Sequence, residues 1–517
     1  MSLQDCFNKI IASQSKTLQE QRDVIQDIKR RGFLKQVINA TIFGLGMSTC
    51  AHKSIADTII EDLPDLGDSD RTNLSPQQAD LLGKQVVLNI YAQGGMVEDF
   101  DCLDYLNKLG NEFVSYSPMA GKDFNFYLVK DKDINAFALP GGYICANNGL
   151  LYTTLSEAEL SGVLAHEVGH VVQHHIFRNI SVHSRAQWTS IAGLIAGVIL
   201  APINPGIAMV AAQSGSALGT QNMLSFSRDY EREADRVGQN LMYKAGFDAH
   251  AMPGFFQRMQ DRYKFNTNDA YAFLQSHPVT LERLSEAETR ANQLPVKMRP
   301  DSLDFLLARE KCRIRQLDYK DSLKFYNSAI AAKRYVSLEA QLYGLSLTHF
   351  LQKDYTESIQ TLDKIKSRVY QSNPMVAGLK AKQLIVSGNN AQADKLYDQL
   401  LDTYPTHKGL WMGQLEFLIA NRGYAKAAVR LDELGRAFPF DPDVWDQYAI
   451  LYADNRYNNP IRYHYGLGSE YIVLGNYKHG LEQYKTALKK KPTNKEDDKI
   501  QSIISARIPE IMRAMSS

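Results

Sequence analysis

The feature that most constrains the fold of this 517-residue chain is a helical repeat in its C-terminal half. Five segments share one pattern: a turn, usually an aromatic residue, and then small and apolar residues at helical spacing. The equivalent positions are Tyr319, Tyr355, Asn390, Tyr424 and Tyr477. The first three steps are 36, 35 and 34 residues and the last is 53, which leaves room for about one extra helix. One such unit cannot bury its apolar face alone, so we expect the units to stack into an α-solenoid.

Prolines close three of these units, at Pro405, Pro439 and Pro492. A period near 34 residues, helix–turn–helix units and a closing proline are typical of tetratricopeptide repeats. The Trp-x-x-Leu-Gly start of that consensus is missing, so the pattern specifies the solenoid more closely than the repeat family. We assign residues 300–517 to a tetratricopeptide-like repeat domain, whose curved surface is expected to bind other proteins.

The N-terminus has the order of an export signal. Arg30 and Arg31 precede an apolar run from about Val37 to Met47, which is too short to span a bilayer. The string RRGFLK resembles a twin-arginine signal. We therefore assign residues 1–50 to an export signal and expect a periplasmic protein. The alternative is a buried amphipathic helix that contains two arginines.

Two further segments bear on the membrane. Residues 51–75 are polar and acidic and are interpreted as a linker. Cys50 follows Met-Ser-Thr, which departs from a lipoprotein box, so lipidation and peripheral membrane association stay open. The apolar segment 188–213 is divided by prolines into two pieces, each too short to span a membrane. We interpret it as a buried helical hairpin, with a lid or a membrane-surface element as the alternative.

Charge and cysteine content exclude some classes of protein. The formal net charge is +1, so no electrostatic argument favours a nucleic-acid partner. The five cysteines form no CxxC pair, which argues against a zinc ribbon or a thioredoxin-type site. If the first fifty residues are removed, three cysteines remain, enough for at most one disulfide of unknown pairing.

A strand-like patch precedes the most polar motif of the chain. Asp123–Asp131 alternates as a half-buried strand does, and Asn135–Leu151 supplies a second extended piece. Pro140 and the two glycines after it force a turn between them. Gly141 and Gly142 would let another backbone come close, so we expect them to mark a substrate edge strand that accepts a peptide by strand addition.

The apolar stretch SGVLAHEVGHVVQHH carries the main chemical signal. His166 and His170 are four residues apart and would share one face of a helix, where two imidazoles can bind one cation. Glu167 would reach a metal-bound water. By chance such a motif arises on the order of once in a hundred such chains. We interpret His174 and His175 as surface residues or as support for a ligand from behind.

A second helix supplies a third ligand. Glu231 and Asp235 are four residues apart in SRDYEREADRVG, so Glu231 can bind the metal while Asp235 orients a ligand histidine. Glu233 points elsewhere and is interpreted as a solvated charge. Taken alone, this segment would be a charged surface helix.

These motifs resemble a known family. HExxH followed by Glu-x-x-Ala-Asp resembles gluzincin-type peptidases related to the CAAX prenyl protease. The order of signal, linker, HEVGH, EREAD and repeats resembles the bacterial beta-barrel assembly-enhancing protease group, most closely over residues from about 78 to 290. This resemblance implies that His166, His170 and Glu231 hold one zinc ion per chain. It also implies that Glu167 is the catalytic base, and Asp235 falls where the family has its assisting acid.

The resemblance also implies a fold and a function. We expect a mainly α protein with a zincin-like α+β metalloprotease domain at residues 76–295, a small sheet with an edge strand, and then the α-solenoid. The expected function is a zinc-dependent endopeptidase of the cell envelope. Its substrates would be misfolded or unassembled proteins, outer-membrane proteins or their assembly machinery above all, bound through the repeats. The alternative is a periplasmic chaperone or scaffold whose peptidase site is largely silent.

Two residues of the segment QSHPVTLERL complete the expected site. Pro278 fixes the backbone after His277, so the imidazole is displayed from a turn. The family places a histidine and an arginine here near the metal. His277 is then either a removable fourth ligand that holds the enzyme inactive or a histidine that only lines the cleft. Arg283 would stabilise the oxyanion or support a ligand from behind.

Overall fold

The computed structural model describes most of the chain. It covers residues 76–122, 124–175, 192–193, 195–197, 199–200, 227–264, 270–453 and 456–516. The predictions for residues 1–50 and 51–75 lie outside these residues, as does most of the segment 188–213. The described apolar residues of that segment are buried against the N-terminal core: Ala192, Ile195, Ala196, Ile199 and Leu200.

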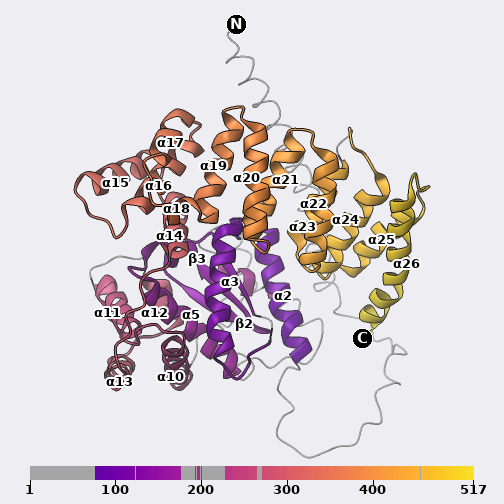
Figure 1. Cartoon of the computed structure of the whole chain (residues 1–517). Coiled ribbons are helices and arrows are strands. Elements are labelled where there is room, and N and C mark those ends of the chain that lie inside the picture. The colour runs from indigo at the N-terminus through magenta and orange to yellow at the C-terminus, as the bar shows by residue number, and fades with distance from the viewer. Residues whose placement is uncertain are drawn as a thin grey trace, which may run out of the picture.

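The N-terminal region, residues 76–292, combines helices with one small sheet (Figure 1). Its elements are α2 (Pro76–Ala92), α3 (Phe100–Ser115), β1 (Asn125–Val129), β2 (Ala136–Leu139), β3 (Tyr143–Asn147), α4 (Asn148–Thr153), α5 (Glu157–Val172), α10 (Arg228–Lys244), α11 (Ala251–Lys264), α12 (Tyr271–Ser276) and α13 (Leu281–Asn292). The mixture of helices with a small sheet confirms the α+β prediction for this region.

The sheet has three strands in the order β1-β3-β2. Strand β1 runs parallel to β3, and β2 runs antiparallel to β3. The prediction for Gly141 and Gly142 needs correction, because both lie in the turn between β2 and β3 with φ of +83° and +86°. A Cβ on Gly141 would come within 2.6 Å of the Asp80 backbone in α2, so this glycine serves internal packing. The edge strand next to the polar cluster described below is β2.

Helices α5 and α10 pack unusually close together, and glycines make this possible. A Cβ on Gly238 of α10 would lie 2.8 Å from the backbone nitrogen of His166, and one on Gly169 of α5 would lie 2.9 Å from the carbonyl oxygen of Ala234. Real side chains cannot tolerate contacts this short. The two glycines therefore bring the HExxH helix and the acidic helix into backbone contact.

The repeat region, residues 303–516, consists of helices alone among the described residues. These are α14 (Leu303–Gln316), α15 (Tyr319–Ala331), α16 (Leu338–Leu351), α17 (Tyr355–Leu362), α18 (Arg368–Gln371), α19 (Pro374–Val386), α20 (Asn390–Thr403), α21 (Lys408–Ala420), α22 (Tyr424–Ala437), α23 (Pro442–Ala453), α24 (Pro460–Val473), α25 (Tyr477–Leu488) and α26 (Lys495–Ser516). Helices that follow each other in sequence pack together, for example α16 with α17, α19 with α20 and α23 with α24, which confirms the predicted α-solenoid.

The phase of the repeat is the one that the sequence predicts. All five equivalent positions are the first residue of a helix, namely of α15, α17, α20, α22 and α25. The long last step holds both α23 and α24, in agreement with the extra helix. The closing prolines have a direct role in two units, because the indole of Trp411 donates to the carbonyl oxygen of Pro405 (2.8 Å) and Trp445 donates to that of Pro439 (2.9 Å).

The repeat region lies as an arc over the N-terminal region (Figure 1). Helix α14 packs against α3 and α4, and α21 packs against α3. Lys311 of α14 forms an ion pair with Asp99 (2.8 Å), the residue that caps α3. The main apolar core is continuous from α2 to α19, and a second core begins only in α19. The predicted boundary at residues 295–300 therefore does not interrupt the core.

The start of the repeat region also supports the HExxH helix directly. Ser302 donates to the carboxylate of Glu157 through both its backbone N–H (2.8 Å) and its hydroxyl (2.7 Å). The backbone N–H of Glu157, the first residue of α5, donates to Asp301 (2.8 Å). An anion at this end of α5 is favoured by the exposed backbone N–H groups of the first turn.

Two remaining expectations concern membranes and disulfides. None of the described helices is both long enough and apolar enough to cross a membrane. Within the described residues, Cys102, Cys145 and Cys312 are buried free thiols.

Candidate metal centre

Four side chains from three elements meet at one buried point. His166 and His170 come from α5, Glu231 from the first turn of α10, and His277 from the residue that follows α12. One ligand atom of each lies within 4.8 Å of the others, and each residue is at most 1% exposed. Sequence reasoning named all four.

The distances within the cluster are those of groups around a common centre. The Nε2 atoms of His166 and His170 lie 3.0 Å apart. The carboxylate of Glu231 lies 3.5 Å from Nε2 of His166 and 3.2 Å from Nε2 of His170. Nδ1 of His277 lies 3.3 Å from Nε2 of His166 and 3.1 Å from Oε1 of Glu231.

The donor chemistry fits a divalent cation. Nδ1 of His166 lies 2.9 Å from Oδ1 of Asp235, and Nδ1 of His170 lies 2.9 Å from Nδ1 of His175. In a neutral His166 the Nδ1 atom beside the Asp235 carboxylate carries the proton, and His170 has the same tautomer if its Nδ1 donates to His175. Both Nε2 atoms then present lone pairs to each other beside a carboxylate, an arrangement that favours a positive charge between them.

Charge balance points the same way. With neutral imidazoles, the buried centre contains the carboxylates of Glu167, Glu231 and Asp235 and the guanidinium of Arg283. Three negative charges and one positive charge leave two negative charges, which a divalent cation would neutralise. Buried charges are otherwise costly, so this balance favours metal binding.

Arg283 joins the two acidic residues of α10. Its Nε and Nη2 atoms donate to Asp235 at 2.8 and 2.9 Å, and its Nη1 lies 2.7 Å from Oε2 of Glu231. Nη1 also donates to the carbonyl oxygen of Pro278 (2.7 Å), which holds the loop that carries His277. Of the two predicted roles for Arg283, these contacts favour support of the ligands over contact with an oxyanion.

The electrostatic environment shifts the pKa values of the two histidines of the motif in opposite directions. Burial lowers the pKa of His166, but the contacts with Asp235 and Glu231 outweigh burial and raise it to about 10. Burial lowers the pKa of His170 to about 3. Without a cation, the cluster thus attracts a proton to His166. Burial also raises the pKa of Glu167, which suits a group that must accept a proton near neutral pH.

Glu167 and His277 face the outer edge of strand β2. Nε2 of His277 lies 3.3 Å from Oε1 of Glu167 and 3.3 Å from the carbonyl oxygen of Ala136. The backbone N–H of Ala138, in the same strand, acts against the rise in the pKa of Glu167. The free edge of β2 therefore points its backbone groups at the candidate base and the candidate fourth ligand.

Two predictions about neighbouring residues need refinement. His174 is exposed, whereas His175 is completely buried and touches His170, so only His175 can support a ligand. The prediction that Glu233 is merely a solvated charge is wrong, because its carboxylate lies 3.1 Å from Nε2 of His175. No spacing rule in the sequence would have singled out this contact between residues 58 positions apart.

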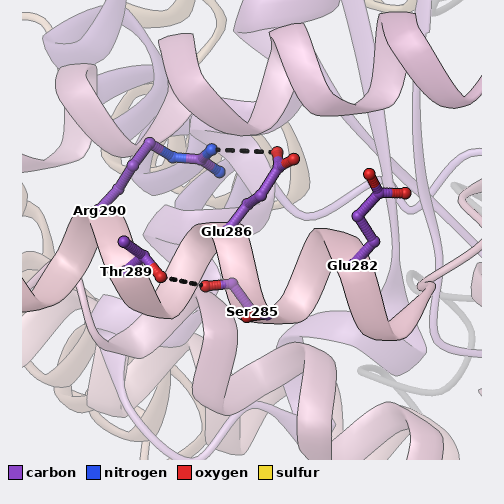
Figure 2. A pocket seen from close by; sticks show the side chains of 5 residues that line it. All are labelled: Glu282, Ser285, Glu286, Thr289 and Arg290. Atoms are coloured by element: carbon purple, nitrogen blue, oxygen red, sulfur yellow. Dashed lines mark hydrogen bonds and ion pairs between the residues drawn. The ribbon is translucent and has the colours of Figure 1, made fainter.

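A separate surface hollow lies on α13 (Figure 2). It is lined by Glu282, Ser285, Glu286, Thr289 and Arg290, and the figure shows the ion pair between Glu286 and Arg290. None of these residues belongs to the buried cluster. The hollow is therefore not the candidate functional site.

Comparison with known families agrees with this geometry. Residues 104–291 match the model of peptidase family M48. The chain carries a peptidase M48 domain. The matched segment of this M48 domain contains the HExxH helix, the acidic helix and the segment around His277, so the buried cluster belongs to a metalloprotease domain.

Relatives of known name extend the match beyond the M48 domain. The beta-barrel assembly-enhancing protease of Yersinia pestis is 29% identical over 390 residues, which cover 75% of this chain and 79% of that protein. The protein of the same name from Escherichia coli K12 is 33% identical over 282 residues, which cover 54% of this chain and 57% of that protein. The mitochondrial metalloendopeptidase OMA1 of Schizosaccharomyces pombe is 29% identical over 193 residues, 37% of this chain and 54% of that protein. The predicted resemblance is thereby confirmed.

Proposed function

We propose that this chain is a zinc-dependent endopeptidase of the cell envelope that hydrolyses misfolded or unassembled proteins. The observation that carries the proposal is the buried set of His166, His170 and Glu231 with Glu167 beside it, next to the free edge of β2. Two imidazoles and one carboxylate favour zinc among common divalent ions. The twin-arginine signal remains a sequence-based prediction.

Each residue of the site would have a separate role in catalysis. A substrate peptide would add as a strand to the free edge of β2, where the backbone of Ala136 and Ala138 can fix its position. A bound zinc ion would lower the pKa of its water and polarise the scissile carbonyl. Glu167 would take a proton from that water and pass it to the leaving amine. Asp235 and Arg283 would keep His166 and Glu231 oriented.

His277 would regulate this site. Its Nδ1 lies among the ligand atoms, and its Nε2 occupies the space between Glu167 and the edge of β2. In this position it supplies a fourth protein ligand, which makes a closed site without room for substrate. The alternative, that His277 only lines the cleft, predicts no such block.

The second candidate function is a chaperone or scaffold with a largely silent peptidase site. The same contacts of His277 favour it, since a permanently closed site would not hydrolyse peptides. The repeat region, which would bind clients or assembly machinery in either case, does not distinguish the two. Substrates in the outer membrane are inferred from the names of the relatives.

Metal content and casein cleavage of the full chain and of Glu167→Gln test the proposal. About one zinc per chain, with cleavage lost in the variant, is the expected result. A chain that binds no metal would overturn the proposal that it is a zinc endopeptidase. Zinc without cleavage, followed by a rise in cleavage in His277→Ala, would identify a latent peptidase. If His277→Ala changes neither cleavage nor zinc affinity, the role of His277 as a ligand is wrong. A Glu167→Gln variant that rescues a deletion strain would favour the scaffold.

A further inference from the structure

A fourth imidazole lies behind the metal centre and has no role in the proposed mechanism. His175 follows the end of α5 and is completely buried, although the adjacent His174 is exposed. His174 has φ of +56°, the left-handed conformation that commonly ends a helix. This turn reverses the chain, so that His175 returns to contact His170 one turn earlier in the helix.

The contacts of His175 form a linear chain from the ligand to a carboxylate. Nδ1 of His175 lies 2.9 Å from Nδ1 of His170, and Nε2 of His175 lies 3.1 Å from Oε2 of Glu233. The ring of Tyr230 stacks on the His175 ring, with centroids 4.5 Å apart and planes 11° from parallel. The stacking fixes the plane of the ring, and the two polar contacts fix its rotation.

A cation at Nε2 of His170 would set the positions of the protons along this chain. If Nε2 of His170 binds a cation, the proton of this neutral ring is on Nδ1, which donates to His175. Nδ1 of His175 must then accept, so its own proton is on Nε2 and is donated to the carboxylate of Glu233. In this arrangement each donor along the chain meets an acceptor, and the chain ends at an anion.

The same helix serves both ligand histidines. Asp235 contacts Nδ1 of His166 directly at 2.9 Å, whereas Glu233 lies nearer the protein surface with a side chain 32% exposed. Residues two apart on a helix point in different directions, so Glu233 cannot contact His170 in the way Asp235 contacts His166. The imidazole of His175 lies between Glu233 and His170 and contacts both.

We propose that His175 and Glu233 are positioning residues that hold His170 in the tautomer and orientation that bind the metal. His175 is not a fifth ligand, because its contact is with Nδ1 of His170, on the side of the ring opposite the ligand atom. The proposal rests on the proposed metal site and extends it to a second carboxylate of α10. Partners that orient ligand histidines in this way are typically worth a factor of about 10 to 100 in metal affinity.

The test is the zinc affinity of the full chain, measured by competition with a chromophoric chelator. His175→Phe keeps a flat ring but cannot accept from His170, and we expect it to weaken zinc binding about 10- to 100-fold. His175→Asn keeps an acceptor near the position of Nδ1 and should recover part of this loss. Glu233→Ala should weaken binding less than His175→Phe, because His175 itself remains.

Glu286→Ala is the matched control. The Glu286 side chain is also 32% exposed and pairs with Arg232 of α10. It also pairs with Arg290 (Figure 2), and no described contact joins it to His166, His170 or His277. It should leave zinc affinity unchanged. The visible spectrum of the cobalt-substituted protein gives a second readout, because a tilted His170 would change its absorption bands in His175→Phe but not in Glu286→Ala.

The outcomes separate the two proposals. A wild-type chain that binds no zinc would overturn both the metal site and the positioning role of His175 and Glu233. A wild-type chain that binds zinc, with equal affinity in His175→Phe and Glu233→Ala, would overturn the positioning role alone. A lower melting temperature of the metal-free His175→Phe protein with unchanged zinc affinity would mean that His175 is a packing residue, and would also overturn the positioning role.

Discussion

The metal centre and the second core of the repeat region bury their side chains by opposite means. The metal centre gathers ionisable residues that are at most 1% exposed and places opposite charges beside one another. The second core, which runs from α19 to α26, consists of aliphatic side chains, tyrosines and tryptophans. Burying apolar surface stabilises a fold under any ordinary condition, whereas burying charge does so only while every partner is present.

This difference means that the stability of the two parts should respond to different variables. The N-terminal region should depend on metal and on the integrity of its ion pairs. The second core should depend on packing and be indifferent to metal. Because the main core continues through α14 to α19, the stability of these six helices of the repeat region should follow that of the N-terminal region.

The largest effect is expected from Glu231→Gln. This change removes a ligand and leaves Arg283 without one of its two buried carboxylates. Breaking one side of a buried ion pair typically costs about 3–5 kcal/mol, and zinc binding should be lost as well. Urea unfolding followed by circular dichroism, with zinc content in parallel, measures both. A variant that keeps its zinc and its unfolding midpoint would contradict the assignment of Glu231 as ligand.

Removal of the metal by chelation should have the next largest effect. A ligand that binds only the folded state at about 1,000 times its Kd contributes about 4 kcal/mol. We expect differential scanning calorimetry to resolve two transitions, of which only that of the main core moves to lower temperature with EDTA. If both transitions moved together, the contrast between the two cores would be wrong.

Much of this contrast was predictable from the sequence. The HExxH spacing and the acidic pair in α10 identified three residues of the buried cluster, since one helical turn places such residues on one face. The repeat period located the first residue of five helices. These are local signals, and each depends only on the period of the α-helix.

The remaining features depend on contacts between residues far apart in the chain. The partnership of His175 with Glu233 requires α5 and α10 to pack at a particular distance, which Gly169 and Gly238 set. The support of Glu157 by Ser302 joins two predicted domains. A periodicity argument reports which face of a helix is buried but not which residue of another helix lies opposite.

In the second core, Trp445→Phe should have a smaller and purely structural effect. The indole N–H donates to the carbonyl oxygen of Pro439, and the ring is 5% exposed. Loss of a buried hydrogen bond and of part of the ring should cost about 1–3 kcal/mol. Calorimetry should show a lower second transition with an unchanged first one, and zinc affinity should equal that of the wild type. A change in zinc affinity would show that the two cores are coupled.

The smallest effect is expected at the contact between the two regions, where Asp104 of α3 faces the start of α21. Burial raises the pKa of Asp104 to about 6, against the opposing influence of His407 and Lys408 and with a further rise from Asp101. An acid with a raised pKa binds its proton more tightly in the folded state, so folding loses stability as pH rises from about 4 to 6. The loss is complete above pH 6 and absent below pH 4.

Asp104→Asn should therefore stabilise the protein at pH 8 and leave it unchanged at pH 4. A shift of about two pKa units corresponds to at most about 3 kcal/mol, and the 29% exposure of this side chain reduces the expected gain to about 1–2 kcal/mol. Urea unfolding of the variant and the wild type at both pH values measures it, with Glu98→Gln as the control at an exposed acid just before α3. An equal gain at both pH values would mean that the amide stabilises the contact by packing or hydrogen bonding, not by removing a buried charge. The contact would then be stabilised without any contribution from charge, as the second core is, and not by paired charges, as the metal centre is.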